Sequence, residues 1–162
     1  TFTSMILTDF ENILAAQAGL VAFIPMLMGT GGNSGAQAST AVIRSLSLGD
    51  TEPRNVLRVM WKEWRVSLIC GLTLAVVNFV KMLLVDGLLL QNANVTVAVA
   101  ATVSLSIVFI VMFAKVVGSV LPIAAEKMGV DPAVMSNPLI STLTDAVSLL
   151  IYIYVAKLVL HI

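Results

Sequence analysis

The sequence has little of what a metal cluster or a catalytic triad requires. Its 162 residues include one cysteine, Cys70, and one histidine, His161. A single cysteine excludes an internal disulfide and a cysteine-based metal cluster. A single histidine at the penultimate position argues against a histidine metal site, a histidine general base and a Ser-His-Asp arrangement.

Charge of either sign is equally scarce. Only 11% of the residues are charged, and 9 Lys and Arg balance 9 Asp and Glu. A chain with no net charge presents no electrostatic footprint for nucleic acid, so no nucleic-acid partner is expected.

Apolar residues make up most of the chain, with 59% of the total and a mean hydropathy of +1.01. A soluble domain is about 45–50% apolar and about 25% charged. The composition therefore predicts a protein of the lipid bilayer. Because a membrane-spanning helix needs about 20 apolar residues, the length allows about four to five spans. We expect an all-α membrane protein whose spans form one compact bundle.

The apolar segments predict the positions of these spans. Residues 1–8 are too short to cross a bilayer and are interpreted as the tail of a truncated first helix. The complete segments lie at about residues 13–46, 59–84, 95–119 and 133–160. Residues 86–94 are expected to form a loop. Residues 115–132 are expected to contain a helix end and a loop, because Pro122 and two glycines interrupt them.

Basic residues predict the orientation in the inner or plasma membrane. Seven of the nine fall in the loops predicted after the second and fourth helices: Arg44, Arg54, Arg58, Lys62, Arg65, Lys115 and Lys127. Basic residues near helix ends are retained on the cytoplasmic side. These two loops are therefore predicted to be cytoplasmic and the C-terminus extracytoplasmic. Trp61 and Trp64 suit a membrane–water interface, and Glu63 is interpreted as a solvated charge of the same stretch.

A single carboxylate, Asp145, lies in the middle of the last apolar segment. A carboxylate there costs at least about 2.5–3.5 kcal/mol and generally faces a polar cavity or an ion path. Asn137, Ser141 and Asp145 recur every fourth residue and share one helix face, which Ser148 and Tyr152 are expected to prolong. The alternatives are a carboxylate neutralised by a proton or a basic partner, and a polar seam between helices.

The second segment carries a matching polar face. Its members recur every fourth residue and three glycines are interleaved with them: Pro25, Gly29, Asn33 and Gln37, with Gly31, Gly32 and Gly35. We expect the proline and the glycines to weaken the helix and free carbonyl oxygens, which is tolerated only inside protein or facing water. Close helix packing by the glycines is the alternative. Two polar faces at comparable depth predict a lined pathway.

The oxygen atoms on these faces predict the kind of ion. Carbonyl, amide and carboxylate oxygens match Mg²⁺ or Ca²⁺ better than a transition metal. One Asp145 supplies one negative charge, so a two-fold homodimer is expected to pair two copies of it around one axis. Because Mg²⁺ holds its water tightly, we expect the pathway to bind the hydrated ion mainly through its waters.

Two segments resemble the magnesium channels of the MgtE family. Residues 25–37, PMLMGTGGNSGAQ, resemble the second-helix signature of that family, and residues 131–145, DPAVMSNPLISTLTD, resemble its fifth-helix signature. The resemblance covers nearly the whole chain. It implies a homodimer of five-transmembrane-helix bundles, a pore formed by the second and fifth helices at the dimer interface, and passive Mg²⁺ flux.

The resemblance also implies which residues line the pore. Asp145 matches the central ion-site residue, Asn137 matches the asparagine two turns earlier, and Ser141 lies at a position that is alanine in some members. Asn33 and Gly29 match pore-lining positions of the second helix. Mg²⁺ is thus expected to be both the bound and the transported ion.

Typical members of that family begin with Mg²⁺-sensing cytosolic N and CBS domains, which are not recognised in this sequence. Residues 1–162 are therefore interpreted as the transmembrane pore domain. Its expected partners are a second copy, the lipid bilayer and the regulatory domains of a longer chain.

The nearest alternative to a channel is a coupled carrier that exchanges a divalent cation for protons or Na⁺. An intramembrane enzyme acting on lipid or peptide would need a second acid, a base or a nucleophile beside Asp145, so the chain is predicted not to be an enzyme. A purely structural subunit is disfavoured by the cost of retaining Asp145.

Overall fold

The computed structural model describes residues 18–50, 55–91 and 95–161, and within them every regular element is a helix. The elements are α3 (Ala18–Val21), α4 (Ile24–Ser47), α5 (Val56–Lys81), the π-helix η2 (Met82–Leu89), α6 (Val97–Lys127) and α7 (Pro132–Leu160). Within α7, the side chains of residues 134–137 are outside the described part. The all-α class is confirmed over the described residues.

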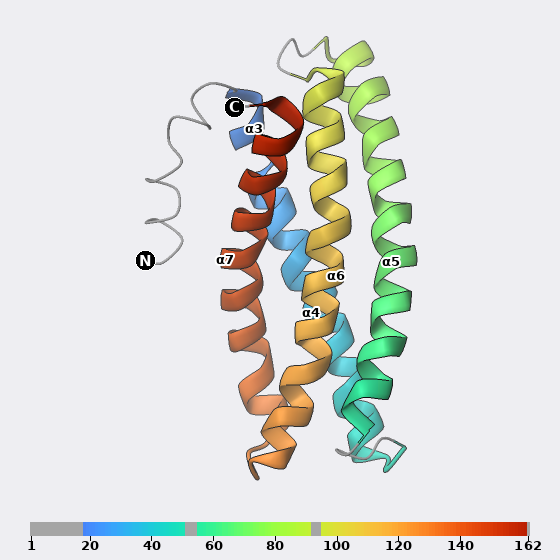
Figure 1. Ribbon diagram of the computed structural model, residues 1–162, viewed down its shortest axis with the longest axis vertical. Helices are drawn as coiled ribbons and strands as arrows, with labels where there is room; N and C mark the ends of the chain where they lie inside the picture. Colours follow the sequence, from blue (N-terminus) through green and yellow to red (C-terminus); the bar gives the residue numbers. More distant parts are fainter. Residues whose placement is uncertain (1–17, 51–54, 92–94, 162) are drawn as a thin grey trace.

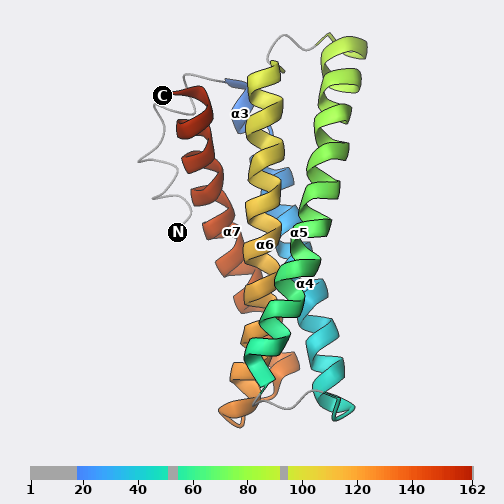
Figure 2. The ribbon, with the colours of Figure 1, turned by 45° about the vertical axis from the view of Figure 1, so that its right-hand side comes forward.

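The four long helices lie along a common axis and form one bundle (Figure 1). Consecutive long helices run in opposite directions, so the ends of α4 and α6 lie at one end of the bundle and the C-terminus lies at the other. The central helix is α6, which packs against α4, α5 and α7, while α4 also packs against α7. A second view shows α5 and α7 on either side of α6 (Figure 2).

Three helical stretches are long and apolar enough to cross a membrane: Val56–Leu89, Val97–Lys127 and Pro138–Leu160. Within the apolar part of the first stretch 17% of the residues are buried in the bundle, whereas 61% are buried within the apolar part of the second stretch. The helix α4 has 24 residues, which is a sufficient length, but its polar face keeps it out of this set. The described residues thus contain three helices capable of crossing a membrane, and the predicted total of five spans stays a prediction.

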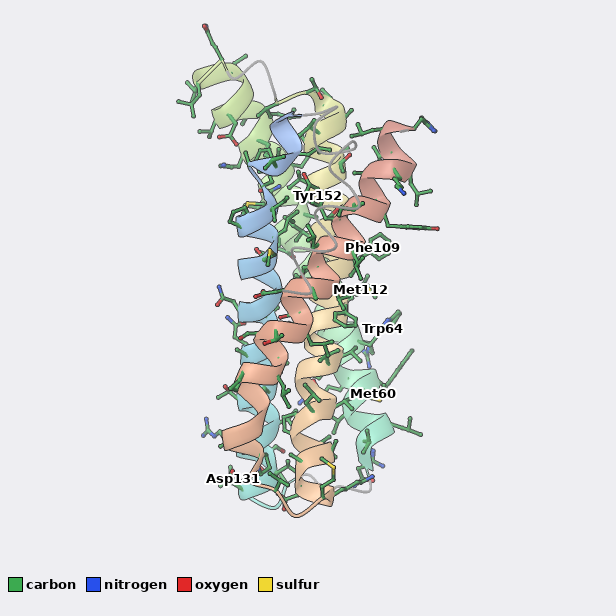
Figure 3. All side chains as sticks on the ribbon, turned by 90° about the vertical axis from the view of Figure 1, so that its left-hand side faces the viewer. Met60, Trp64, Phe109, Met112, Asp131 and Tyr152 are labelled. Atoms are coloured by element: carbon green, nitrogen blue, oxygen red, sulfur yellow. The ribbon has the colours of Figure 1, made fainter. Side chains whose placement is uncertain are left out.

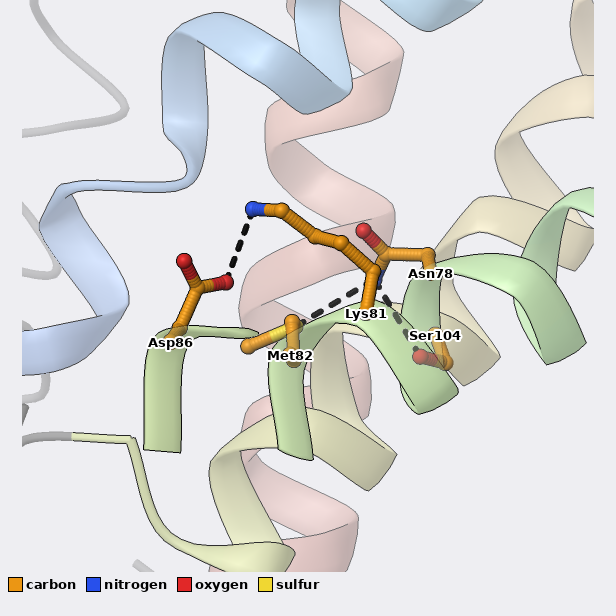
Figure 4. Close-up of polar contacts among 5 residues, drawn as sticks. All are labelled: Asn78, Lys81, Met82, Asp86 and Ser104. Carbon is orange, nitrogen blue, oxygen red and sulfur yellow. Dashed lines mark hydrogen bonds and ion pairs between the residues drawn. The ribbon is translucent and has the colours of Figure 1, made fainter. Parts of the chain in front are cut away.

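The helix that begins with α5 continues past its predicted end. Residues 86–89 were expected to belong to a loop, but η2 extends the helix to Leu89. Hydrogen-bonded residues are five apart in a π-helix, and this spacing brings the Lys81 ammonium within 2.7 Å of the Asp86 carboxylate (Figure 4). The expectation of a loop over these residues was therefore wrong, because the ion pair lets the helix carry a charged residue.

A polar contact joins α5 to α6 one turn before η2. The Asn78 amide donates hydrogen bonds to the Ser104 hydroxyl and to the Met82 sulfur, each at 3.3 Å (Figure 4). An amide inside a membrane bundle is expensive unless it finds such partners. This contact therefore fixes the register between α5 and α6.

The prediction of a helix end near residue 119 was also wrong. The helix α6 continues through the buried Pro122 to Lys127 and ends where Gly129 adopts a φ of 71°. Pro122 cannot donate to the Gly118 carbonyl, but Gly118 lies against the Gly35 backbone, where close helix packing offsets that loss. Lys115 consequently lies inside α6 and not in the following loop.

Candidate functional site

The carboxylate that the sequence singled out lies on α7, close to its midpoint. Asp145 is partly exposed on the single protomer, and Ser141, one turn earlier, is exposed. Asn137 lies on the same helix, but its side chain is outside the described residues. These positions leave the predicted ion-binding face of α7 open on the outside of the bundle.

The start of α7 is set by its own sequence. The Asp131 carboxylate accepts a hydrogen bond from the Ala133 N–H at 2.8 Å, and Pro132 occupies the first turn, where a missing N–H costs nothing. Figure 3 shows Asp131 at the turn between α6 and α7 and Tyr152 in the other half of the helix. Asp145 lies between them along the chain, well inside the bundle's length.

The polar stripe of α7 does not continue as the sequence predicted. Ser148 and Tyr152 are buried, and the Tyr152 hydroxyl donates a 2.9 Å hydrogen bond to the Leu20 carbonyl in front of α4. These two residues therefore face the core of the bundle. The extension was wrong because other helices cover this part of α7: Ser148 packs against Gly31 of α4, and Tyr152 reaches Leu20.

The helix α4 has two different faces. Gly29, Asn33 and Gln37 are exposed, whereas Gly31 and Gly35 are buried between α4 and its neighbours. The helix runs without interruption from Ile24 to Ser47, so the expectation of a weakened helix with freed carbonyl oxygens was wrong.

Steric packing explains the uninterrupted helix. A Cβ atom on Gly31 would lie 2.6 Å from the Ser148 hydroxyl oxygen, and one on Gly35 would lie 2.6 Å from the Ile140 Cγ2. Each glycine costs a helix about 1 kcal/mol relative to alanine, but here it lets α7 approach closely. The packing interpretation is thus correct for the buried glycines, while the polar residues between them face outward.

The two polar faces flank the line along which α4 and α7 touch. A Cβ atom on Gly32 would lie 4.0 Å from the Thr144 hydroxyl oxygen, which marks the contact. Asn33 and Asp145 are the next residues after this contact on their helices, so they lie at similar depth. The prediction that the two polar faces occur at comparable depth is confirmed by this register.

The carbonyl oxygens of α7 near this contact are already used. The Thr144 hydroxyl donates to the Ile140 carbonyl at 2.6 Å and to the Ser141 carbonyl at 3.2 Å, and the Thr142 hydroxyl donates to the Pro138 carbonyl at 2.9 Å. Thr144 is fully buried. Such bonds from a side chain to the preceding turn bend a helix, so Thr144 sets the local course of the segment that carries Ser141 and Asp145.

A shallow groove continues the exposed face of α4 toward the end of that helix. It has a volume of about 470 Å³ and is lined by Asn33, Ala36, Gln37, Thr40, Ala41 and Arg44. Thr40 was not among the predicted site residues, and Arg44 was expected only in a loop. The signal was present, because Gln37, Thr40 and Arg44 continue the same face at spacings of three and four.

One acidic residue is buried against expectation. Glu63 was predicted to be a solvated charge, but it lies in α5 and is only 8% exposed. It belongs to the face of α5 that packs on α6, together with Ser67 and Gly71. Glu63 is buried because residues four apart share a helix face, and this face of α5 packs against α6.

The described residues of one protomer form no complete cation site. They contain no group of three or more His, Cys, Asp or Glu side chains arranged to hold a metal. Asp145 is the one carboxylate in the sequences of α4 and α7. The open faces therefore offer a single negative charge together with amide and hydroxyl groups, which suits weak contact with a hydrated cation better than a dehydrated metal centre.

Comparison with known proteins identifies the family. The model of the MgtE family, described as a divalent cation transporter, matches residues 24–155. The chain belongs to the MgtE family. This match spans both segments whose resemblance the sequence analysis noted, so that assignment is confirmed.

Individual relatives agree with this assignment. The magnesium transporter MgtE of Thermus thermophilus is 44% identical over 159 residues, which are 98% of this chain and 33% of that protein. The magnesium transporter MgtE of Bacillus subtilis is 34% identical over 156 residues, 96% of this chain and 33% of that protein. The chain thus spans about a third of the length of the curated MgtE relatives it matches, and both relatives are named magnesium transporters.

Proposed function

We propose that this chain forms the pore through which an MgtE protein passes Mg²⁺ down its electrochemical gradient, with two copies related by a two-fold axis. One observation carries the proposal. At the depth of Asp145, α4 exposes Asn33 and Gln37 and α7 exposes Ser141 and Thr142 beside Leu139 and Leu143, although both helices belong to a membrane bundle.

The cost of polar groups in lipid supports a second copy. A carboxylate facing hydrocarbon costs at least about 2.5–3.5 kcal/mol, and amide side chains add to that cost. Placing these faces of two protomers against each other removes them from lipid and leaves a polar path between them. A two-fold axis also supplies two Asp145 carboxylates, which match the charge of one divalent cation.

The proposed ion site consists of paired Asp145 with Asn137 and Ser141 on α7, and Asn33 and Gly29 on α4. Since Mg²⁺ keeps most of its water in protein sites, the oxygen atoms of these residues accept hydrogen bonds from the ion's water shell. The carbonyl oxygen of Ser141 already accepts the Thr144 hydroxyl, so the carboxylates are the strongest acceptors that face the ion.

The helices α4, α5 with η2, α6 and α7 are proposed as the second to fifth membrane spans of the longer protein. In the same proposal, cytosolic N and CBS domains of that protein regulate the pore. The share of each relative that this chain covers, 33%, agrees with further domains outside the matched region.

Single-channel recording separates a channel from a coupled carrier. We expect unitary Mg²⁺ currents far above about 10³ ions per second, a rate at the upper end of enzyme-like turnover. Slow transport that requires a proton or Na⁺ gradient would overturn the channel mechanism and favour the carrier. Replacing Asp145 by asparagine, which preserves its size, should abolish the current.

The orientation is proposed from the basic residues, with the ends of α4 and α6 on the cytoplasmic side. Cysteine variants test it in intact cells after Cys70 is replaced by alanine. A cysteine at Leu90 should react with a membrane-impermeant reagent added outside, and one at Asp50 should not. The reverse labelling would overturn the orientation.

A further inference from the structure

A basic and aromatic surface lies on the first three turns of α5. Its members share one helix face at spacings of three and four, and all are exposed: Arg58, Trp61, Lys62, Trp64 and Arg65. Glu63 and Ser67 lie on the opposite face, buried in the bundle. We call the five exposed residues the α5 basic–aromatic surface.

The indole rings of the two tryptophans on this surface are stacked. Their ring centroids are 5.3 Å apart and their planes differ by 10°, and Trp61 is 61% and Trp64 is 39% exposed. Figure 3 shows Met60 and Trp64 in the half of the bundle that contains Asp131 and the turn between α6 and α7. Tryptophan favours the level of lipid headgroups, because one part of the ring is apolar and its N–H needs a polar partner.

The character of the same face changes along the helix. Beyond Arg65 this face exposes the apolar side chains of Ile69, Leu72 and Val76, and the hydroxyl of the neighbouring exposed Thr73 donates to the Ile69 carbonyl at 2.8 Å. The next basic residue is Lys81, near the other end of the span. A band of basic and aromatic residues followed by about three apolar turns matches a headgroup followed by acyl chains. A soluble acidic partner would match the basic residues but would leave the apolar turns uncovered.

We propose that the α5 basic–aromatic surface binds an anionic phospholipid of the leaflet on that side of the membrane. The three cations attract the phosphate and the additional headgroup charge, the stacked indoles lie beside the glycerol region, and the acyl chains extend along Ile69, Leu72 and Val76. The proposal is independent of ion conduction, because it uses none of the residues assigned to the pore.

Tryptophan fluorescence tests the proposal directly, because the 162 residues contain two tryptophans and both belong to this surface. Any tryptophan elsewhere in the full-length protein is first replaced by phenylalanine. The protein is reconstituted into phosphatidylcholine bilayers that contain a small fraction of brominated phosphatidylglycerol or, separately, of brominated phosphatidylcholine. Bromine quenches the indoles only at contact, so the ratio of quenching gives the relative affinity of the two lipids.

Each basic side chain near an anionic surface favours binding by about fivefold at low salt. We therefore expect the brominated anionic lipid to be preferred by at least about fivefold. The variant Arg58→Gln/Lys62→Gln/Arg65→Gln should lower this preference below about twofold. The single variants Lys127→Gln, near the same end of the bundle, and Lys157→Gln, near the other end, should retain it.

A salt titration of the unmodified protein keeps the test decisive if the triple variant fails to fold. The preference should fall when the ionic strength rises from about 0.05 M to about 0.5 M, because the Debye length shortens. Equal quenching by the two brominated lipids would overturn the proposal. So would a preference that survives in the folded triple variant, or the absence of quenching by either lipid, which would mean that protein covers the tryptophans.

Discussion

The outer faces of α5 and of the α4–α7 pair are both open on the single protomer, but they differ in chemistry. Along most of α5 the open face is apolar, with Leu72, Val76 and Val80 exposed. On α4 and α7 the open face carries Asn33, Gln37 and Asp145 at the corresponding depth. An apolar face is stable in lipid, whereas a polar face is stable there only when protein or water covers it. The comparison teaches that exposure alone does not identify a lipid-facing helix.

The largest effect is expected from removing the charge of the polar face. Asp145→Ala should fold but lose high-affinity Mg²⁺ binding, because only neutral oxygens would then face the ion. A hydrogen bond to a charged group is worth about 1.5–3 kcal/mol, so the affinity should fall by about 10- to 100-fold. Isothermal titration of the purified protein measures this, and an unchanged affinity would contradict the assignment of the site.

The two faces of α4 should respond differently to one added methyl group. Gly35→Ala places a Cβ atom 2.6 Å from the Ile140 Cγ2 and 3.2 Å from the Ala114 carbonyl oxygen, and such overpacking should lower the free energy of unfolding by about 1–3 kcal/mol. Gly29→Ala is the matched control, because no described atom outside its own stretch of α4 lies within 4 Å of its added Cβ. Thermal unfolding in detergent compares the two variants, and equal losses would contradict the assignment of Gly35 to the packed face.

A change of geometry without a change of charge should have a smaller effect. Asp145→Glu moves each carboxylate inward by one methylene and crowds a hydrated ion. We expect a lower Mg²⁺ conductance and a weaker preference for Mg²⁺ over Ca²⁺, since Ca²⁺ gives up its water more readily and accepts varied coordination. Recordings in mixed Mg²⁺ and Ca²⁺ solutions that match the unmodified protein would refute the hydrated-ion mechanism while leaving the position of the site intact.

The buried hydroxyl behind the polar face should have a modest effect on ion binding. Thr144→Val keeps the volume but removes the bonds to the Ile140 and Ser141 carbonyls. Each such bond is worth about 0.5–1.5 kcal/mol, so a relaxed α7 should lower the Mg²⁺ affinity by about two- to tenfold. Thr102→Val removes a matched buried bond in α6, from the Thr102 hydroxyl to the Ala98 carbonyl at 2.8 Å, and should leave the affinity unchanged. Thr144→Ser should restore it, and an effect of equal size at Thr102 would indicate a general loss of stability.

The smallest effect is expected on the apolar face of α5. Val76→Ala truncates an exposed side chain that contacts lipid in place of protein, so the free energy of unfolding should change by less than about 0.5 kcal/mol. Unfolding in lipid nanodiscs measures it. A loss of more than about 1.5 kcal/mol would show that another protein surface covers this face, and the contrast between the two open faces would then no longer hold.

The sequence predicted the helical class, the membrane and the family correctly because those depend on properties that add up along the chain. The apolar content predicts that the helices lie in lipid and not in water. The two segments that contain Asn33 and Asp145 identify the family. The same reasoning placed helix ends near residues 119 and 84 and was wrong at both. A proline or a charge ends an isolated helix, but Gly118 packed on Gly35 and the Lys81 ion pair offset that cost here.

Sequence by itself therefore determined that this protein spans a membrane, which helices carry polar residues and that Asp145 is the one carboxylate of the α7 segment. Tertiary structure decided which of those residues face outward. Ser148 and Glu63 were both assigned to open positions from the sequence, yet both are buried, while Thr40 and Arg44 line the groove on α4. A spacing of three to four residues defines a face of a helix, but the direction of that face is fixed only when the neighbouring helices pack against it.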